Sequence, residues 1–201
     1  GPRPKWEDHG AQLVADVAPY ETAKLRMLNG AHSMLAYCGL ERGFTFVHEA
    51  IADPELRSLT HRLMIEEAAP TIDAAPDQDL AAYAESLIER FAEPAVRHRL
   101  AQIAMDGSQK IPQRWLDTAA VLTRRSLPCD AIAAGFAAWV RHLAEGRCVD
   151  DPHGEELHAI AIKGGARGIV ERCLGTGTGM TALWSGYQHL AQTLLSAERE
   201  D

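Results

Sequence analysis

The sequence predicts a mainly α-helical protein with a short strand-like lead-in at its N-terminus. Alanine and leucine, both strong helix formers, number 33 and 21, whereas the β-branched valine and isoleucine total only 18. Aromatic residues make up 6% of the chain, which is low for a β-sandwich or a barrel. With 201 residues, 46% of them hydrophobic and 24% charged, the chain can bury a core without disulfide staples.

Each element can be justified in chain order, starting with residues 12–17, which are the best strand candidate. The first helix is expected to open at Pro19 or Tyr20 and to run to about Leu40. The short apolar piece 47–52 follows it.

Asp53 and Pro54 predict an N-cap and a proline at the first helical position, and the helix they open should stop before Pro70. Residues 73–79 are rich in proline and aspartate and predict a loop. Later helices are expected over 80–91, 94–105, 108–125 and 128–144, followed by a loop rich in glycine, aspartate and proline over 146–154. The last 45 residues should hold two or three helices broken by glycines, the final one over about 181–197.

Net charge, hydropathy and cysteine spacing exclude several classes of protein. Twenty basic and 28 acidic residues give a net charge of −8, which disfavours nucleic-acid binding. The longest apolar run, 131–140, is far shorter than the roughly 20 residues of a membrane span, and no signal peptide is evident, so we expect a cytoplasmic protein. The cysteines lack zinc-site spacing and are expected to be reduced, with two disulfides as the alternative; they are Cys38, Cys129, Cys148 and Cys173.

Four polar residues of the first predicted helix share one arc of less than half its circumference. At about 100° per residue, with Lys24 at zero, Glu21 lies at about 60°, His32 at about 80° and Asn29 at about 140°. An amine whose pKa is lowered by burial can take up a proton, while an amide and an imidazole can hold an oxygen atom. These residues are therefore candidates for acting on a hydroxyl or carbonyl group, and a solvated polar face is the alternative.

Residues 24–33 contain the pattern Lys-x4-Asn-x2-His. This pattern resembles the signature of the polyol-specific long-chain dehydrogenase/reductase (mannitol dehydrogenase) family. Residues 46–49, 90–94 and 106–114 resemble the turn that follows this signature, the lead-in to the second conserved block, and the block itself. The resemblance covers residues 2–125 clearly and the tail loosely.

The resemblance implies a multi-helical C-terminal domain like that of 6-phosphogluconate dehydrogenase. Residues 19–201 would form this substrate-binding and catalytic domain. Residues 1–18 would be the end of, or the linker from, an N-terminal Rossmann-type nucleotide-binding domain of the same protein. NAD or NADP would be bound mainly by that other domain, no metal is expected, and this chain alone should not catalyse hydride transfer.

The resemblance also implies roles for individual residues. Lys24 would be the general acid or base that exchanges a proton with the reacting alcohol, and Asn29 and His32 would hydrogen-bond the reacting oxygen. Glu21 matches a position implicated in proton exchange with solvent, and Lys110 matches a position that contacts substrate.

The second block, Asp-Gly-Ser-Gln-Lys-Ile-Pro-Gln-Arg, resembles the branch of the family that interconverts D-mannonate and fructuronate. Mannitol 2-dehydrogenase or a related polyol dehydrogenase is the alternative within the family. A non-catalytic helical binding or oligomerisation domain is the alternative from another class. The carboxylate of a uronate could accept charge-assisted hydrogen bonds from basic residues, and the candidates are Arg97, His98, Arg99 and Arg114.

Three further motifs do not predict a site. The glycine-rich string 175–179 does not follow a predicted strand, so it predicts an interhelical loop and not a dinucleotide-binding turn. His48 and Glu49 lack the second histidine of a metalloprotease motif. His153 and His158 lie five residues apart beside a loop, which disfavours a metal-binding pair.

Overall fold

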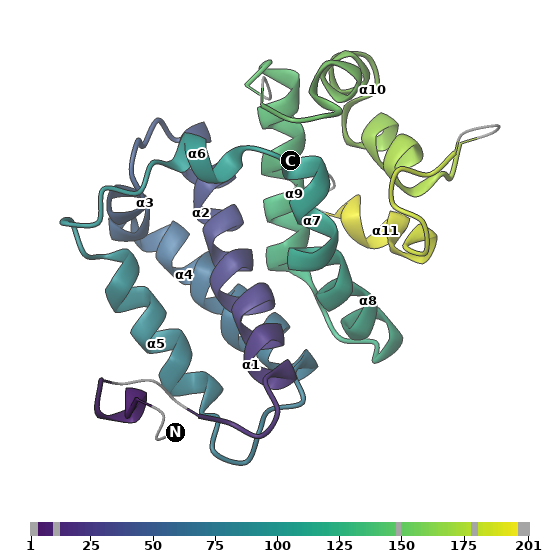
Figure 1. The fold of residues 1–201 in the computed structure, drawn as a ribbon. Helices are drawn as coiled ribbons and strands as arrows, with labels where there is room; N and C mark the ends of the chain where they lie inside the picture. The colour runs from purple at the N-terminus through teal and green to yellow at the C-terminus, as the bar shows by residue number, and fades with distance from the viewer. Residues whose placement is uncertain (1–3, 10–12, 148–149, 178–180, 197–201) are drawn as a thin grey trace.

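The structure, a computed structural model, describes residues 4–9, 13–147, 150–177 and 181–196 and is built from helices (Figure 1). No strand forms within these ranges, where an isolated antiparallel bridge between Phe46 and Arg99 is the sole β-type pairing. The mainly α-helical fold predicted from the sequence is therefore confirmed. None of the helices in the described ranges is long and apolar enough to cross a membrane.

The helical segments follow one another with short connections. The α-helices are α1 (Ala18–Ala23), α2 (Gly30–Glu41), α3 (Val47–Ala52), α4 (Pro54–Arg62), α5 (Leu80–Phe91), α6 (Leu100–Ala104), α7 (Gly107–Ile111), α8 (Asp117–Arg124), α9 (Asp130–Ala144), α10 (Gly154–Leu174) and α11 (Ala191–Leu194). The 3₁₀ segments are η1 (Trp6–His9), η4 (Ala69–Thr71) and η6 (Gln188–Leu190). The π-helical segments are η2 (Lys24–Asn29), η3 (Leu63–Ala68) and η5 (Pro112–Leu116).

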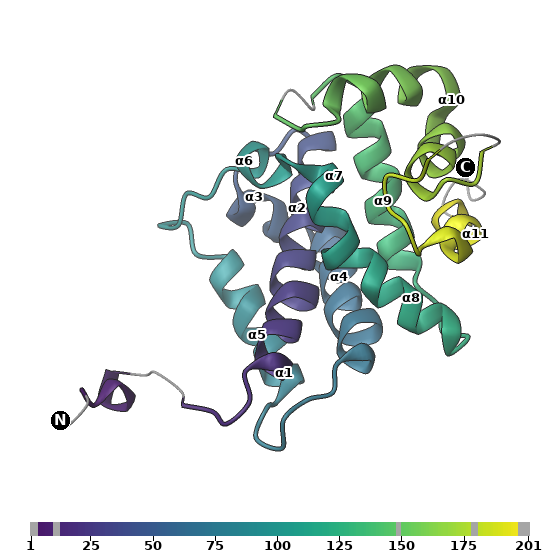
Figure 2. The ribbon, with the colours of Figure 1, turned by 45° about the vertical axis from the view of Figure 1, so that its right-hand side comes forward.

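Helices α2 and α9 lie side by side at the centre of the molecule (Figures 1 and 2). Both views show α3 and α5 on one side of this pair and α8, α10 and α11 on the other. The π segment η2 joins α1 to α2 and packs against both η3 and η5. The segment η1 stands clear of the bundle in Figure 2.

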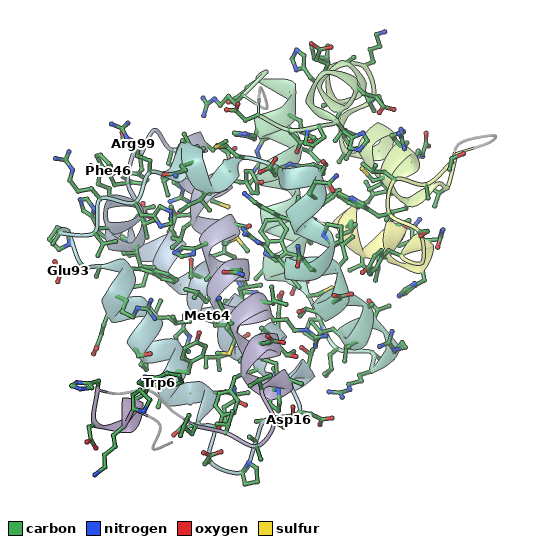
Figure 3. The ribbon with its side chains drawn as sticks, in the orientation of Figure 1. Trp6, Asp16, Phe46, Met64, Glu93 and Arg99 are labelled. Carbon is green, nitrogen blue, oxygen red and sulfur yellow. The ribbon has the colours of Figure 1, made fainter. Side chains whose placement is uncertain are left out.

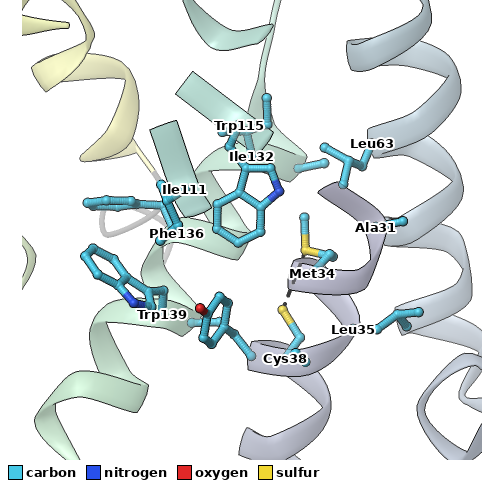
Figure 4. Close-up of a cluster of buried hydrophobic side chains, with 14 of the residues drawn as sticks. Ala31, Met34, Leu35, Cys38, Leu63, Ile111, Trp115, Ile132, Phe136 and Trp139 are labelled. Atoms are coloured by element: carbon cyan, nitrogen blue, oxygen red, sulfur yellow. Dashed lines mark hydrogen bonds between the residues drawn. The ribbon is translucent and has the colours of Figure 1, made fainter. Parts of the chain in front are cut away.

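The core lies between α2, η5 and α9 (Figure 4). Met34 of α2, Trp115 of η5, and Phe136 and Trp139 of α9 are all fully or almost fully buried. Burying each side chain of this size stabilises the fold by about 1.5–3 kcal/mol. The Trp115 indole donates a hydrogen bond to the Gly30 carbonyl at 3.1 Å, so its polar atom is satisfied inside the core.

Several predicted elements are confirmed with their boundaries. The first helix runs without a break from Ala18 to Glu41, and α3 and α5 have the predicted bounds. The Asp53 carboxylate accepts hydrogen bonds from the backbone amides of Glu55 (3.0 Å) and Leu56 (2.9 Å), as an N-cap does.

The helix predicted over 94–105 is wrong in its first half. Residues 94–99 are not helical, and α6 begins at Leu100. The segment instead pairs with the chain before α3: the Val47 amide donates to the His98 carbonyl, and the Leu100 amide donates to the Thr45 carbonyl, both at 3.0 Å. This long-range pairing outweighs the local helix signal of Pro94.

Two other predictions at the ends of the chain are also corrected. The strand expected over 12–17 does not form in residues 13–17, because the described ranges offer it no partner strand. The final helix is much shorter than 181–197, since residues 181–187 are not helical. The Trp184 amide donates to the Cys173 carbonyl at 2.7 Å, which docks this segment on the end of α10.

Candidate functional site

The residues of the first motif lie on consecutive turns of one helix that runs from α1 through η2 into α2. This continuous helix, from Ala18 to Glu41, is the motif helix. Glu21 and Lys24 are exposed, whereas Asn29 and His32 are half-buried. Within the described ranges, neither the Lys24 ammonium nor the Asn29 amide has a hydrogen-bond or ion-pair partner. Two polar groups on one helix are therefore free to bind another molecule.

The π-helical turn brings these two groups closer in angle than the sequence predicted. On an ideal α-helix Lys24 and Asn29 lie about 140° apart. In η2 the hydrogen bonds span five residues instead of four, so residues five apart come closer to alignment along the helix. Single π-helical turns are frequent at functional sites. No pattern in the sequence predicted this π-helical turn.

A cavity of about 210 Å³ lies beside the His32 ring. It is lined by Leu28, His32, Val47, Arg90, Phe91, Glu93, Val96 and His98. The His32 ring centroid lies 4.8 Å from that of Phe91 and 5.2 Å from that of His98, the latter in an edge-on arrangement. The structure thus brings together two of the predicted site residues, His32 and His98.

The environment of His32 keeps its imidazole neutral. Burial, reinforced by the neighbouring His98 and by the positive charges of Arg114 and Arg90, lowers the pKa of His32 to about 4. At pH 7 the ring therefore carries one N–H donor and one acceptor nitrogen. A neutral ring can hydrogen-bond a hydroxyl or a carbonyl without itself taking up the proton.

The predicted candidate Arg97 lies outside the residues that line this cavity. Its guanidinium carbon is 4.9 Å from the centroid of the Phe46 ring, and that of Arg99 is 5.4 Å from the same ring. Figure 3 shows Phe46 beside Arg99 at the edge of the molecule, with Glu93 on the same connection. Arg97 and Arg99 thus flank an aromatic ring, and His98 between them points into the cavity wall.

Sequence reasoning did not assign Arg90 and Phe91 to the site. Both line the cavity and belong to the last turn of α5. Their one sequence signal was the resemblance of residues 90–94 to the lead-in of the second family block.

The second motif forms a tight turn into α7. Asp106 has φ 54°, a left-handed conformation, and Gly107 follows it. A Cβ at Gly107 would lie 2.5 Å from Trp139 Nε1 and 2.6 Å from the Tyr37 hydroxyl, so no larger residue fits there. The Asp151 carboxylate accepts from both the amide (2.7 Å) and the hydroxyl (2.6 Å) of Ser108 and fixes the start of the helix.

The candidate Lys110 is held close to this turn. Its Nζ donates to the Met105 carbonyl at 2.7 Å and lies 3.7 Å from the Asp106 carboxylate. Figures 1 and 2 show α7 and α5 on opposite sides of α2. Lys110 and the His32 cavity therefore flank the motif helix from two sides.

Arg114 reaches the motif helix from η5. Its Nη1 donates to the Ser33 hydroxyl at 2.8 Å. The close approach depends on Gly30, since a Cβ there would lie 3.2 Å from the Arg114 carbonyl oxygen. The sequence named Arg114 as one of four basic candidates for a carboxylate partner, and the structure places it directly on the motif helix.

The remaining candidates do not add to the site. Gly175 ends α10 in a left-handed conformation, and the string 175–179 includes residues outside the described ranges. A dinucleotide-binding turn follows a strand, and no strand precedes this string in the described ranges. The described cysteines are buried and unpaired, and Cys148 lies outside the described residues; the three are Cys38, Cys129 and Cys173.

Comparison with known proteins identifies the family of this chain. Residues 16–171 match the family described as mannitol dehydrogenase C-terminal domain. The chain is 44% identical over 164 residues to D-mannonate oxidoreductase of Escherichia coli, covering 79% of this chain and 34% of that protein. It is 37% identical over 170 residues to mannitol dehydrogenase 2 of Saccharomyces cerevisiae, covering 81% of this chain and 34% of that protein.

The solved structure of Pseudomonas fluorescens mannitol 2-dehydrogenase, in a ternary complex with NAD and D-mannitol, has a similar fold. The TM-score is 0.81 at 27% sequence identity, covering 99% of this chain and 41% of that chain. The chain belongs to the mannitol dehydrogenase C-terminal domain family. It spans about a third of the length of the curated relatives it matches.

Proposed function

We propose that this chain is the substrate-binding and catalytic domain of a zinc-independent, NAD(P)-dependent oxidoreductase that interconverts D-mannonate and fructuronate. The observation that carries the proposal is the free Lys24 amine and free Asn29 amide on one π-helical turn, next to the neutral imidazole of His32. The similarity to a D-mannonate oxidoreductase and the form of residues 106–114 favour a hexonate substrate.

The residues of the motif helix would divide the chemistry between them. Lys24 would take the proton from the secondary alcohol during oxidation and return it during reduction. Asn29 and His32 would hydrogen-bond the same oxygen and stabilise the charge that develops on it. Glu21 lies one turn before Lys24 and is exposed, so it could pass the proton between Lys24 and solvent.

The hydride acceptor would be a nicotinamide cofactor held mainly by an N-terminal Rossmann-type domain of the same protein, with residues 1–18 leading from that domain to residues 19–201. The described ranges contain no strand that a glycine-rich turn could follow, so we assign no cofactor-binding residue to this chain. Lys110 and His98 would contact the substrate on either side of the motif helix.

Mannitol oxidation is the second candidate function. It is favoured by the similarity of 99% of the chain to a solved mannitol 2-dehydrogenase and by the yeast mannitol dehydrogenase relative. The two candidates share the motif helix and differ in whether the substrate carries a carboxylate.

A dehydrogenase assay on the full-length protein tests both candidates. NAD and NADP would each be offered with D-mannonate, mannitol, arabinitol and sorbitol, with EDTA present throughout. We expect cofactor reduction with D-mannonate that EDTA does not affect. Faster reduction with mannitol would reverse the order of the two candidates, and silence with every substrate would contradict the proposed chemistry.

A further inference from the structure

Arg114 is a half-buried cation without an acidic partner. Its guanidinium donates to the neutral Ser33 hydroxyl, and within the described ranges no carboxylate lies at ion-pair distance from it. Burial lowers the pKa of Arg114, and the one group that opposes this effect is the Tyr37 hydroxyl, itself uncharged at neutral pH because burial raises its pKa. A desolvated charge without a counter-charge is costly to the fold.

Other arginines of the chain are better satisfied although they are more exposed. Arg42 lies within hydrogen-bond distance of two carboxylates, and Arg172 forms an ion pair with Glu156. The half-buried Arg26 donates to both the carbonyl and the hydroxyl of Thr71 and lies near the charge of Asp117. Arg114 therefore stands out as a buried donor group with most of its N–H groups uncommitted.

The position of Arg114 relates it to the motif helix. Asn29, Ser33 and Tyr37 lie four residues apart and form one stripe of the helix. Arg114 binds the middle of this stripe, so it lies about one helical turn, or about 5.4 Å, along the axis from Asn29. Lys110 precedes Arg114 by one turn and adds a second positive charge on the same helix face.

We infer that Arg114, assisted by Lys110, binds the carboxylate of an acyclic sugar acid whose reacting carbon lies at Lys24 and Asn29. This inference rests on the proposed function and assigns its substrate class to one residue. A six-carbon acid carries its carboxylate at one end and its reacting hydroxyl towards the other, which matches two binding points about one helical turn apart. The planar guanidinium can donate two parallel hydrogen bonds to a carboxylate, and a neutral polyol offers it no counter-charge.

The test compares charged and neutral substrates in the full-length enzyme. Arg114→Gln should raise KM for D-mannonate by about 10- to 100-fold, the range expected for losing a hydrogen-bonded charge pair. The same variant should change kcat/KM for mannitol by less than about threefold. Arg114→Lys should recover part of the affinity for D-mannonate, since it restores the charge without the planar pair of donors.

Arg57→Gln is the matched control, because it removes the same charge from an exposed arginine of α4 that does not line the His32 cavity, and it should leave the kinetics with both substrates unchanged. Ser33→Ala removes the hydroxyl that holds Arg114 and should raise KM for D-mannonate by a smaller factor. An equal loss with D-mannonate and mannitol would overturn the inference, as would weaker cofactor binding with an unchanged KM for D-mannonate.

A binding measurement separates failure of this inference from failure of the proposed function. If the full-length protein reduces neither cofactor with any substrate, the proposed function fails while calorimetric binding of D-mannonate can still be measured. Binding that is lost in Arg114→Gln and kept in Arg57→Gln would support the inference on its own. No binding of D-mannonate to the wild-type protein would overturn it.

Discussion

Two ionisable side chains in the interior of the molecule, Glu67 and Arg114, differ in how far the fold satisfies their hydrogen-bonding groups. Glu67 of η3 is 4% exposed, and its carboxylate accepts hydrogen bonds from the amides of Ala131 (2.6 Å) and Ile132 (2.9 Å) at the start of α9. Arg114 of η5 is half-buried and has the Ser33 hydroxyl as its partner. The carboxylate of Glu67 is satisfied within the fold, whereas most N–H groups of Arg114 have no partner in the described ranges.

The difference separates a structural polar group from a functional one. Glu67 satisfies two of the backbone amides that every helix start leaves without partners, so it links η3 to the central helix α9. Lys24 and Asn29 lie on the motif helix, Arg114 of η5 contacts this helix through Ser33, and all three keep donors free. We propose that the satisfied groups hold the fold and that the free groups act on substrate.

The largest effect should come from the free group at the proposed reacting oxygen. Lys24→Ala in the full-length enzyme should lower kcat by about 10²- to 10⁴-fold, because the proton has no acceptor in its place. Its melting temperature should match that of the wild type, since the exposed Lys24 side chain makes no hydrogen bond in the described ranges. Steady-state kinetics and a thermal melt measure the two quantities. A large fall in the melting temperature would show that Lys24, like Glu67, stabilises the fold.

The satisfied group should behave in the opposite way. Glu67→Ala leaves two amides at the start of α9 without an acceptor and opens a cavity, so it should lower the free energy of unfolding by about 3 kcal/mol. Turnover per folded molecule should be unchanged, because Glu67 lies outside the site. Chemical denaturation and an assay at low temperature test both parts, and a selective loss of kcat would show that Glu67 has a functional role.

Glu67 also predicts a dependence of stability on pH. Burial outweighs its two amide hydrogen bonds and raises the pKa of Glu67 from 4.5 to about 7. Between these two values the folded state binds more protons than the unfolded state, so stability should fall by about 3 kcal/mol as the pH rises from about 4.5 to above 7. Unfolding measured across this range should show the fall in the wild type and lose it in Glu67→Gln, whose side chain cannot ionise. The same slope in both proteins would assign it to another group.

A smaller effect should come from the turn that positions Lys110 and Arg114. Gly107→Ala forces a methyl group against Trp139 and Tyr37 and should cost about 1–3 kcal/mol of stability. Gly164→Ala is the control, because a Cβ at Gly164 meets nothing within 4 Å and should be neutral or stabilising by up to about 1 kcal/mol. Thermal melts of the two variants give the comparison, and equal melting temperatures would mean that the turn can relax.

Local signals predicted most of the fold. Asp53 and Pro54 marked the start of α4, and the predicted bounds of α5 match the structure. The prediction for segment 94–99 was wrong because its hydrogen-bond partners, near residues 45–47, lie about 50 residues earlier in the chain. A local sequence pattern cannot predict such a long-range pairing.

The sequence predicted which residues belong to the candidate site better than it predicted their arrangement in space. The helical arc of Lys24, Asn29 and His32 could be computed from spacing, but the π-helical turn that changes their angles could not. The bond between Arg114 and Ser33 joins residues 81 apart in sequence, so it emerged from the fold alone. Arg97 and Arg114 were both candidates for the carboxylate of a substrate, and the structure distinguishes them because Arg97 is exposed whereas Arg114 is half-buried.

Chemical rescue of the Lys24→Ala full-length enzyme tests most directly whether the free groups act on substrate. Cofactor reduction with D-mannonate would be measured at rising concentrations of a small primary amine. We expect almost no turnover without the amine and a rate that rises with the concentration of its free base, because the added amine replaces the missing proton acceptor. Near-normal turnover without any amine would contradict this expectation, since Lys24 would then not be the acid or base.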